Sequence, residues 1–250
     1  MSVRTIDRAA VDAWRPLSGN RLVAPDGSTL TINHPSDRLI EPWFTDCRVK
    51  LAASPAASSV GLRAFETGPV GTVDGHVAIL LSGQYVAEYA GQGGTFLVAQ
   101  NADNSMGLVA WQGRWHEAYG WVNVPNATHA QALETLADLS FTDTPAGLLV
   151  RPRDSEVYQR ITVTKHIRGI GYARITQTPR VANELPTWSG HRVRVGEVWR
   201  QEVAAEVGGR HPAALVCATP TAVITIDARD GGTEDTALEF LSALTAVTWK

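Results

Sequence analysis

One pattern of apolar and polar positions occurs twice along the chain. At a constant offset of 105 residues and without a gap, residues 117–139 align with residues 222–244. Identity is highest in Ala-Leu-Glu-x-Leu-x-x-Leu, which occupies 132–139 and 237–244. Self-similarity at a fixed offset is typical of a repeated structural unit. The pattern therefore predicts two domains of similar plan.

Each copy predicts a strand, a turn and an amphipathic helix. The strand-like stretches are Tyr119–Val124 and Val223–Ala228, and the helices begin at Thr128 and Thr233. A threonine at this position accepts hydrogen bonds from the N–H groups of the first helical turn. Thr128 and Gln131 have the spacing of a capping box. The second copy lacks this box and has acidic residues in its first turn, where the helix dipole favours them.

A β-hairpin precedes each predicted helix. Met106–Gln112 and Trp115–Val124 flank a Gly-Arg turn, and Ala213–Ala218 and Ala222–Ala228 flank a Thr-Pro turn. Turn residues between two strand-like stretches are the usual signal for a hairpin. Further strands are expected at Gly83–Tyr89, Thr95–Gln100, Tyr158–His166, Gly171–Thr178 and Val193–Val207.

These elements predict an α+β fold with two tandem domains, 1–145 and 146–250. In each domain we expect an antiparallel sheet with a C-terminal helix packed on one face. A short helix over Ile6–Trp14 should pack on the first domain, and Leu51–Ser59 should form a loop. The order of the elements resembles that of PsbP-like α+β domains, one in each half. The resemblance implies a fold and transfers no site residues, because a fold does not determine a function.

Composition predicts a globular protein of the cytoplasm, with a secreted protein that has lost its signal as the alternative. The 19 arginines against three lysines indicate a GC-rich bacterial genome. Of 250 residues, 44% are hydrophobic and 19% are charged. The N-terminus has no apolar stretch of a secretory signal, and the longest apolar run, Ala213–Ala218, is too short to span a membrane. Two cysteines provide no disulfide framework. We expect Cys217 to pack as a small apolar residue and Cys47, between two charged neighbours, to be more exposed.

Charge is distributed unevenly along the chain. Residues 1–145 contain 9 basic and 14 acidic residues, and residues 146–250 contain 13 basic and 11 acidic residues. Ten of the basic residues lie within 151–200. This segment could contact nucleic acid, an acidic protein or the acidic first half of the chain. Nucleic acid is disfavoured, because the net charge is −3 and no nucleic-acid-binding motif accompanies the basic segment.

No motif in the sequence predicts a catalytic, metal-binding or cofactor-binding residue. The histidines lack the spacing of a helical zinc pair, and Gly-x-Ser-x-Gly and phosphate-binding loops are absent. His116 and Glu117 are adjacent on a predicted strand, so their side chains should point to opposite faces. Asp74-Gly75-His76 has the composition of a turn with a solvated histidine.

A group of aromatic residues is the most promising candidate for binding. Tyr119 and Trp121 align with isoleucines of the second copy and are expected in the core beneath the helix. The repeat does not assign Trp111 or Trp115 to the core. Together with Arg192 and Arg194, which alternate with valines on a predicted strand, they are the candidate binding residues.

Two hypotheses on function follow. The first is a non-enzymatic cytoplasmic protein that binds another protein, in a chaperone, adaptor or immunity-type role. The alternative is an enzyme whose active site lies in the cleft between the two domains without a local motif. For such an enzyme the first candidates are His76, His116, Glu117 and His191. The sequence specifies neither the partner nor the oligomeric state.

Overall fold

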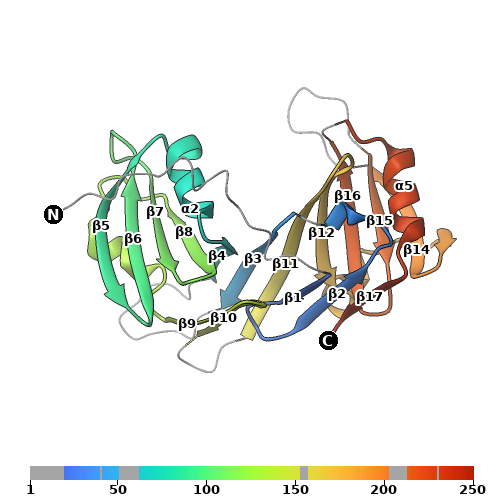
Figure 1. Ribbon diagram of the computed structural model, residues 1–250, viewed down its shortest axis with the longest axis horizontal. Coiled ribbons are helices and arrows are strands. Elements are labelled where there is room, and N and C mark those ends of the chain that lie inside the picture. Colours follow the sequence, from blue (N-terminus) through green and yellow to red (C-terminus); the bar gives the residue numbers. More distant parts are fainter. Residues whose placement is uncertain (1–19, 40, 51–61, 153–156, 203–212, 230) are drawn as a thin grey trace. The chain divides into compact units, whose positions relative to one another are not determined.

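The structure, a computed structural model, describes residues 20–39, 41–50, 62–152, 157–202, 213–229 and 231–250 (Figure 1). The predicted helix over Ile6–Trp14 and the predicted loop over Leu51–Ser59 lie outside these residues. The chain forms two compact units. The central unit consists mainly of Phe44–Arg160, and the C-terminal unit joins Ile161–Lys250 to Ser28–Trp43 and the strand before it.

The central unit contains an antiparallel sheet with the strand order β3-β4-β8-β7-β6-β5. The strands β9 and β10 form a separate hairpin, and the predicted domain boundary between residues 145 and 146 lies in the turn of this hairpin. The elements are β3 (Trp43–Lys50), β4 (Leu62–Pro69), α2 (Thr72–Gly75), η2 (His76–Leu80), β5 (Gln84–Gly91), β6 (Gly94–Gln100), β7 (Gly107–Gln112), β8 (His116–Val122), α3 (His129–Glu134), β9 (Leu139–Thr144) and β10 (Gly147–Pro152).

Both faces of this sheet are covered, so β7 is buried along almost its whole length. On one face, Val73 and Val77 of α2 and η2 pack against a cluster that includes Leu108 and Tyr119. The helix α3 packs over β6 and β7. A Cβ on Gly120 would lie 2.9 Å from a methyl group of Thr135, just after α3. Since successive residues of a strand face opposite ways, α3 lies on the face opposite Tyr119.

In the C-terminal unit, the strands pair antiparallel in the order β13-β14-β15-β16-β12-β11. The helix α5 packs on β15 and β16, as Figure 1 shows, and α4 packs on β12 and β16. The elements are β1 (Arg21–Val23), β2 (Thr29–Asn33), η1 (Asp37–Leu39), β11 (Val157–Ile167), β12 (Gly171–Gln177), α4 (Thr178–Val181), η3 (Ala182–Glu184), β13 (His191–Val193), β14 (Gly196–Glu202), β15 (Ala213–Ala218), β16 (Ala222–Ala228), α5 (Glu234–Ala243) and β17 (Ala246–Trp249).

Segments from both ends of the chain form a small sheet in the C-terminal unit. Its strand order is β1-β2-β17, with Ala246 opposite Asn33 and Trp249 opposite Leu30. The indole N–H of Trp249 also donates to the Ser28 hydroxyl at 2.7 Å. The C-terminal strand thereby holds β2 in this unit, although β2 precedes most of the central unit in the sequence.

The predicted α+β class is wrong, because the protein is mostly β. Strands account for 52% and helices for 18% of the structure. The expected C-terminal helices are short, and each is followed by a strand. Leu139 already begins β9, and β17 follows α5 directly. Residues with strong β propensity, such as Phe141 and Val247, stop the helical pattern after its leucines.

Several predicted local signals are present, but the strand predicted over Val193–Val207 is interrupted by the turn between β13 and β14. The hairpins β7-β8 and β15-β16 are confirmed, and Thr128 forms the expected capping box with Gln131. The second helix also has a capping box, which the sequence did not predict. There, Thr236 takes the place of the usual Glu or Gln, because a hydroxyl can both donate and accept hydrogen bonds.

Candidate functional site

The most exposed tryptophan side chain described in the C-terminal unit lies beside an edge strand of the sheet. Trp188 is 66% exposed, in the loop between η3 and β13. The loop is anchored at both ends. Leu185 packs on the apolar cluster formed by α4 and the sheet, and the backbone carbonyl of Trp188 accepts a hydrogen bond from Trp199 Nε1 at 2.8 Å. The indole is therefore held at the surface by a fixed backbone.

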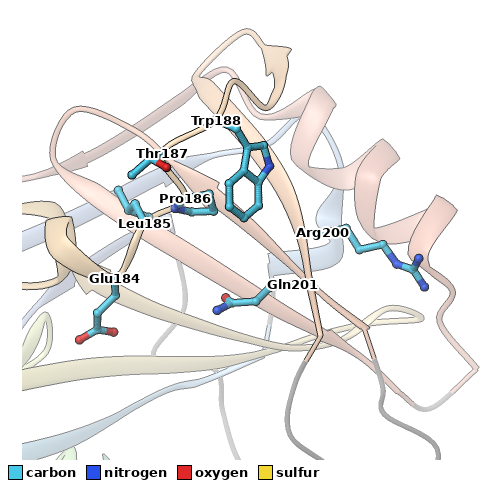
Figure 2. Close-up of a pocket in the computed structure, with 7 residues that line it drawn as sticks. All are labelled: Glu184, Leu185, Pro186, Thr187, Trp188, Arg200 and Gln201. Carbon is cyan, nitrogen blue, oxygen red and sulfur yellow. The ribbon is translucent and has the colours of Figure 1, made fainter.

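A depression of about 390 Å³ lies next to this indole. Figure 2 shows the Trp188 ring pointing toward the space between Pro186 and Gln201. The lining residues are Glu184, Leu185, Pro186, Thr187, Trp188, Arg200 and Gln201. The lining thus combines apolar side chains with polar and charged ones, a combination common where proteins bind other molecules.

The surface around Trp188 carries exposed arginines. The side chain of Arg192 is 89% exposed, and its Nε lies 3.7 Å from a carboxylate oxygen of Glu197. Arg194 is exposed in the turn after β13 and forms no ion pair with any residue that the structure describes. Arg200 is bound to Glu234 of α5, at 3.0 Å. The two arginines that the sequence predicted as binding residues lie on β13 and in the turn after it, C-terminal to the Trp188 loop, and both are exposed.

The other two predicted binding residues belong to the central unit. Trp111 is only 1% exposed and stacks on Phe141, with ring centroids 4.8 Å apart. Trp115 is half-buried, and the guanidinium of Arg114 lies 4.9 Å from the centre of its ring. Neither indole therefore offers a large free surface to a partner.

Sequence reasoning did not select Trp188. A signal was nevertheless present, because Trp188 lies in Leu-Pro-Thr-Trp-Ser-Gly, where turn-forming residues surround a large apolar side chain. A tryptophan in such a loop has few neighbours in sequence that could bury it.

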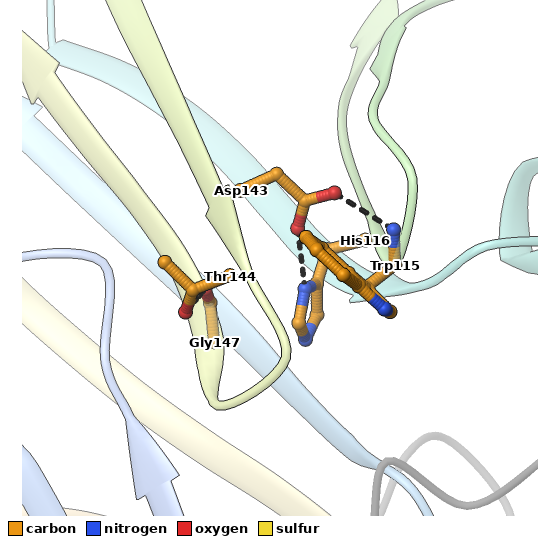
Figure 3. Close-up of polar contacts among 5 residues, drawn as sticks. All are labelled: Trp115, His116, Asp143, Thr144 and Gly147. Carbon is orange, nitrogen blue, oxygen red and sulfur yellow. Dashed lines mark hydrogen bonds and ion pairs between the residues drawn. The ribbon is translucent and has the colours of Figure 1, made fainter.

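The prediction for His116 and Glu117 is confirmed, since the two side chains have separate partners. His116 Nδ1 lies 2.8 Å from Asp143 Oδ1, and the backbone N–H of Trp115 donates to Asp143 Oδ2 at 2.7 Å (Figure 3). Glu117 instead accepts from the backbone N–H of Val73 at 2.8 Å. Burial raises the pKa of Glu117 above the usual range. Asp143 therefore ties the β7–β8 turn to β9, while Glu117 anchors α2.

A chain of polar side chains connects β4, β8 and the start of η2. Tyr119 donates to Glu66 Oε2 at 2.9 Å, and its hydroxyl lies 3.0 Å from His76 Nε2. Burial is the main cause that raises the pKa of Glu66 and Tyr119 and lowers that of His76. Since Tyr119 gives its proton to Glu66, His76 Nε2 must donate to Tyr119. Such a chain could transfer a proton, but nothing in its geometry selects a substrate.

The turn predicted at Asp74-Gly75-His76 is a helical segment instead. Asp74 and Gly75 end α2, and His76 begins η2, a single π-helical turn. Asp74 is buried and accepts from the Tyr85 hydroxyl at 2.5 Å. The prediction failed because this polar sequence is stabilised by the sheet beneath it and not by its own periodicity. The candidates of the enzyme hypothesis are not brought together: the three in the central unit bond to different groups, and His191 is exposed in the C-terminal unit.

Both cysteines are free and buried. Burial raises the pKa of Cys217 to about 12, and also that of Cys47. The prediction for Cys217 is confirmed. The prediction that Cys47 is more exposed is wrong. Its side chain points into the interior of the unit, whereas those of its neighbours Asp46 and Arg48 point to the opposite, exposed face of the strand. Neither thiol is activated as a nucleophile.

The part of the chain that the structure describes contains no group of three or more His, Cys, Asp or Glu that could hold a metal ion. Within the same residues, no helix is long and apolar enough to span a membrane. The hypothesis of an active site between the domains stays a prediction, as does the resemblance to PsbP-like domains. Comparison with family models, curated proteins and solved structures found no match to this chain.

Proposed function

We propose that the chain is a protein-binding module of the cytoplasm, in a chaperone, adaptor or immunity-type role, and that it contacts its partner through the surface around Trp188. The observation that carries the proposal is the 66% exposure of Trp188 beside a depression that is lined in part by apolar side chains. Tryptophan and arginine are the residues that most often dominate the energy of protein interfaces. Here both types occur together around one loop.

The exposed area of the indole is large enough to matter. A tryptophan side chain buries about 150–250 Å² when it is fully covered. Covering the two-thirds that is now exposed would remove about 130 Å² from water, which corresponds to about 3 kcal/mol at 25 cal/mol per Å². The hydrogen bond from Trp199 to the Trp188 backbone reduces the entropy lost on binding, because the loop is already ordered.

The surface specifies the chemistry of the partner. Leu185, Pro186 and Trp188 of the lining offer contact to an apolar side chain. The exposed Arg192 and Arg194, on the strand and turn that follow the loop, would attract carboxylates. We therefore infer a partner segment in which an apolar residue is flanked by Asp or Glu. The cytoplasmic location is supported by Cys47 and Cys217, which are both unpaired, since unpaired cysteines are typical of reducing compartments.

Selection from a phage-displayed random peptide library tests the proposal without knowledge of the natural partner. Peptides selected on the wild-type protein should contain an apolar residue with acidic neighbours. Their affinity should fall roughly tenfold or more in Trp188→Ala, since about 1.4 kcal/mol corresponds to a factor of ten. Arg192→Glu should weaken binding too, and more strongly at low salt, because salt screens exposed charges.

Tyr172→Ala is the matched control. Tyr172 is an exposed aromatic residue of the same unit, on β12, and is 44% exposed. Its replacement should leave peptide affinity unchanged. The proposal is refuted if selected peptides bind Trp188→Ala as tightly as the wild type, or if selection yields no peptide that binds.

A further inference from the structure

A second depression, of about 350 Å³, lies in the central unit at one end of β6. It is lined by Gln100, Asn104, Asn126, Ala127, Thr128 and His129. These residues come from the turn between β6 and β7 and from the segment that leads into α3. The backbone N–H of Asn126 donates to the carbonyl of Asn104 at 2.8 Å, which joins the two segments directly.

The turn after β6 is fixed by its own side chains. Asn101 accepts from the backbone N–H of Met106 at 3.1 Å and donates to Ser105 at 2.9 Å. Asp103 accepts from both the N–H and the hydroxyl of Ser105, and these bonds lower the pKa of Asp103. The polar groups of these side chains are thus used within the turn, whereas Asn104 lines the depression.

Neutral amide side chains, those of Gln100, Asn104 and Asn126, form a large part of the lining. Gln100 Nε2 donates to the carbonyl of Ala127 at 3.1 Å, which fixes the direction of its side-chain carbonyl. The amides of Asn104 and Asn126 form no side-chain hydrogen bond with other described residues, so each can offer a donor and an acceptor. No Asp, Glu, Lys or Arg is among the described residues of the lining. The lining therefore disfavours phosphates and other ions.

An exposed aromatic ring lies next to the same site. Tyr89 of β5 is 40% exposed, and its hydroxyl lies 3.4 Å from Nδ1 of His129, one of the lining residues. An aromatic ring beside neutral donors and acceptors is complementary to a sugar, which has apolar C–H groups on its ring face and hydroxyls at its edge. The ring would supply apolar contact and the amides would supply direction.

We propose that this depression is a carbohydrate-binding site, in which Gln100, Asn104 and Asn126 hydrogen-bond the hydroxyls of a neutral sugar and Tyr89 packs against an adjoining ring. The site belongs to the central unit and uses none of the residues around Trp188. It is thus independent of the proposed protein-binding function.

Saturation-transfer-difference NMR on the full chain provides the test. The probes are glucose, N-acetylglucosamine, maltose and cellobiose, each at about 10 mM, a concentration suited to the weak affinity of an open site. At least one probe should receive saturation from the wild-type protein. A disaccharide should bind more tightly than its monosaccharide, because its second ring can add contact with Tyr89, whose hydroxyl lies 3.4 Å from His129 of the lining.

Glycine variants separate the loss of the amides from the loss of the fold. Asn104 and Asn126 have φ angles of 55°, a conformation that glycine adopts without strain. Asn104→Gly and Asn126→Gly should each reduce sugar affinity roughly tenfold, as expected for one or two lost hydrogen bonds. Tyr89→Ala should weaken the disaccharide more than the monosaccharide, and Trp188→Ala should have no effect. Absence of transfer from all four probes, or unchanged affinity in both glycine variants, overturns the proposal.

Discussion

Replacing Lys165 with methionine should remove a pH dependence of folding stability around neutral pH. Lys165 lies on β11 and is 1% exposed. Its ammonium is 3.9 Å from the centre of the Trp43 ring and donates to the backbone carbonyl of Glu41. Burial lowers the pKa of Lys165 from 10.5 to about 7, and the Glu41 carboxylate, which also lies 3.7 Å from Arg168, opposes the shift.

The sign and size of the effect follow from proton linkage. In the unfolded chain Lys165 stays protonated up to pH 10.5, whereas in the folded protein it begins to lose its proton near pH 7. Between these values the unfolded state binds more protons, so stability rises with pH. Each pKa unit corresponds to about 1.4 kcal/mol. The full shift would therefore be worth about 5 kcal/mol as an upper limit, with about 2 kcal/mol gained between pH 7 and 8.5.

Urea denaturation followed by tryptophan fluorescence measures this contribution at pH values from 6 to 8.5. The quantity of interest is the difference in unfolding free energy between the wild type and Lys165→Met, because other titrating groups cancel in it. Lys250→Met, which changes an exposed lysine, is the matched control. NMR with lysine ¹³C-labelled at Cε gives an independent readout, because the chain contains only three lysines and one signal should titrate near pH 7.

Two results would contradict the reasoning. One is a free-energy difference between the wild type and Lys165→Met that does not change from pH 6 to 8.5. The other is a spectrum in which all three lysine signals titrate near 10.4, the value of a solvated lysine. Either would mean that water reaches the ammonium in the folded protein.

Two further expectations concern other buried polar groups. His34 Nδ1 accepts from the backbone N–H of Ser36 at 3.0 Å, and burial lowers the pKa of His34. The folded state thus favours the neutral ring, so the stability of the fold should decrease as the pH drops below 6.5. Thermal denaturation at pH 7.5 and 5.5 should show a smaller loss for His34→Phe, and equal losses would contradict this account. Asp143→Ala should cost about 2–4 kcal/mol in urea denaturation, because it leaves His116 and the Trp115 N–H without their buried acceptor. Asp143→Asn should cost less, and a cost below about 0.5 kcal/mol for Asp143→Ala would show that water replaces the carboxylate.

Local features were predictable because they depend on neighbours in the sequence. The hairpin β7-β8 follows from strand-like stretches around a Gly-Arg turn, and the helix start at Thr128 follows from its capping box. The opposite directions of His116 and Glu117 follow from the alternation of side chains along a strand. In each case the relevant atoms are a few residues apart, so the pattern alone determines the geometry.

The covering of the sheets could not be predicted in this way. Tyr119 was expected in the core beneath the helix that follows β8, and it is buried, but beneath α2 and η2. The length of the helices was also misjudged, because β17 pairs with β2 from the other end of the chain. Such pairings depend on which distant segments bury one another, and short-range periodicity contains no information about them.

The candidate site shows the same division. Composition and spacing alone placed Arg192 and Arg194 on a solvated surface, since charged side chains rarely bury without a partner. The apolar character of tryptophan does not by itself show which tryptophan side chain is buried in the core. Trp111 is covered by Phe141, which comes from a separate hairpin, whereas Trp188 is left exposed because its loop passes the edge of a sheet. The sequence thus determined the local turns, caps and alternation, and the tertiary structure decided which large side chains remain free to bind, because burial depends on residues far away in the chain.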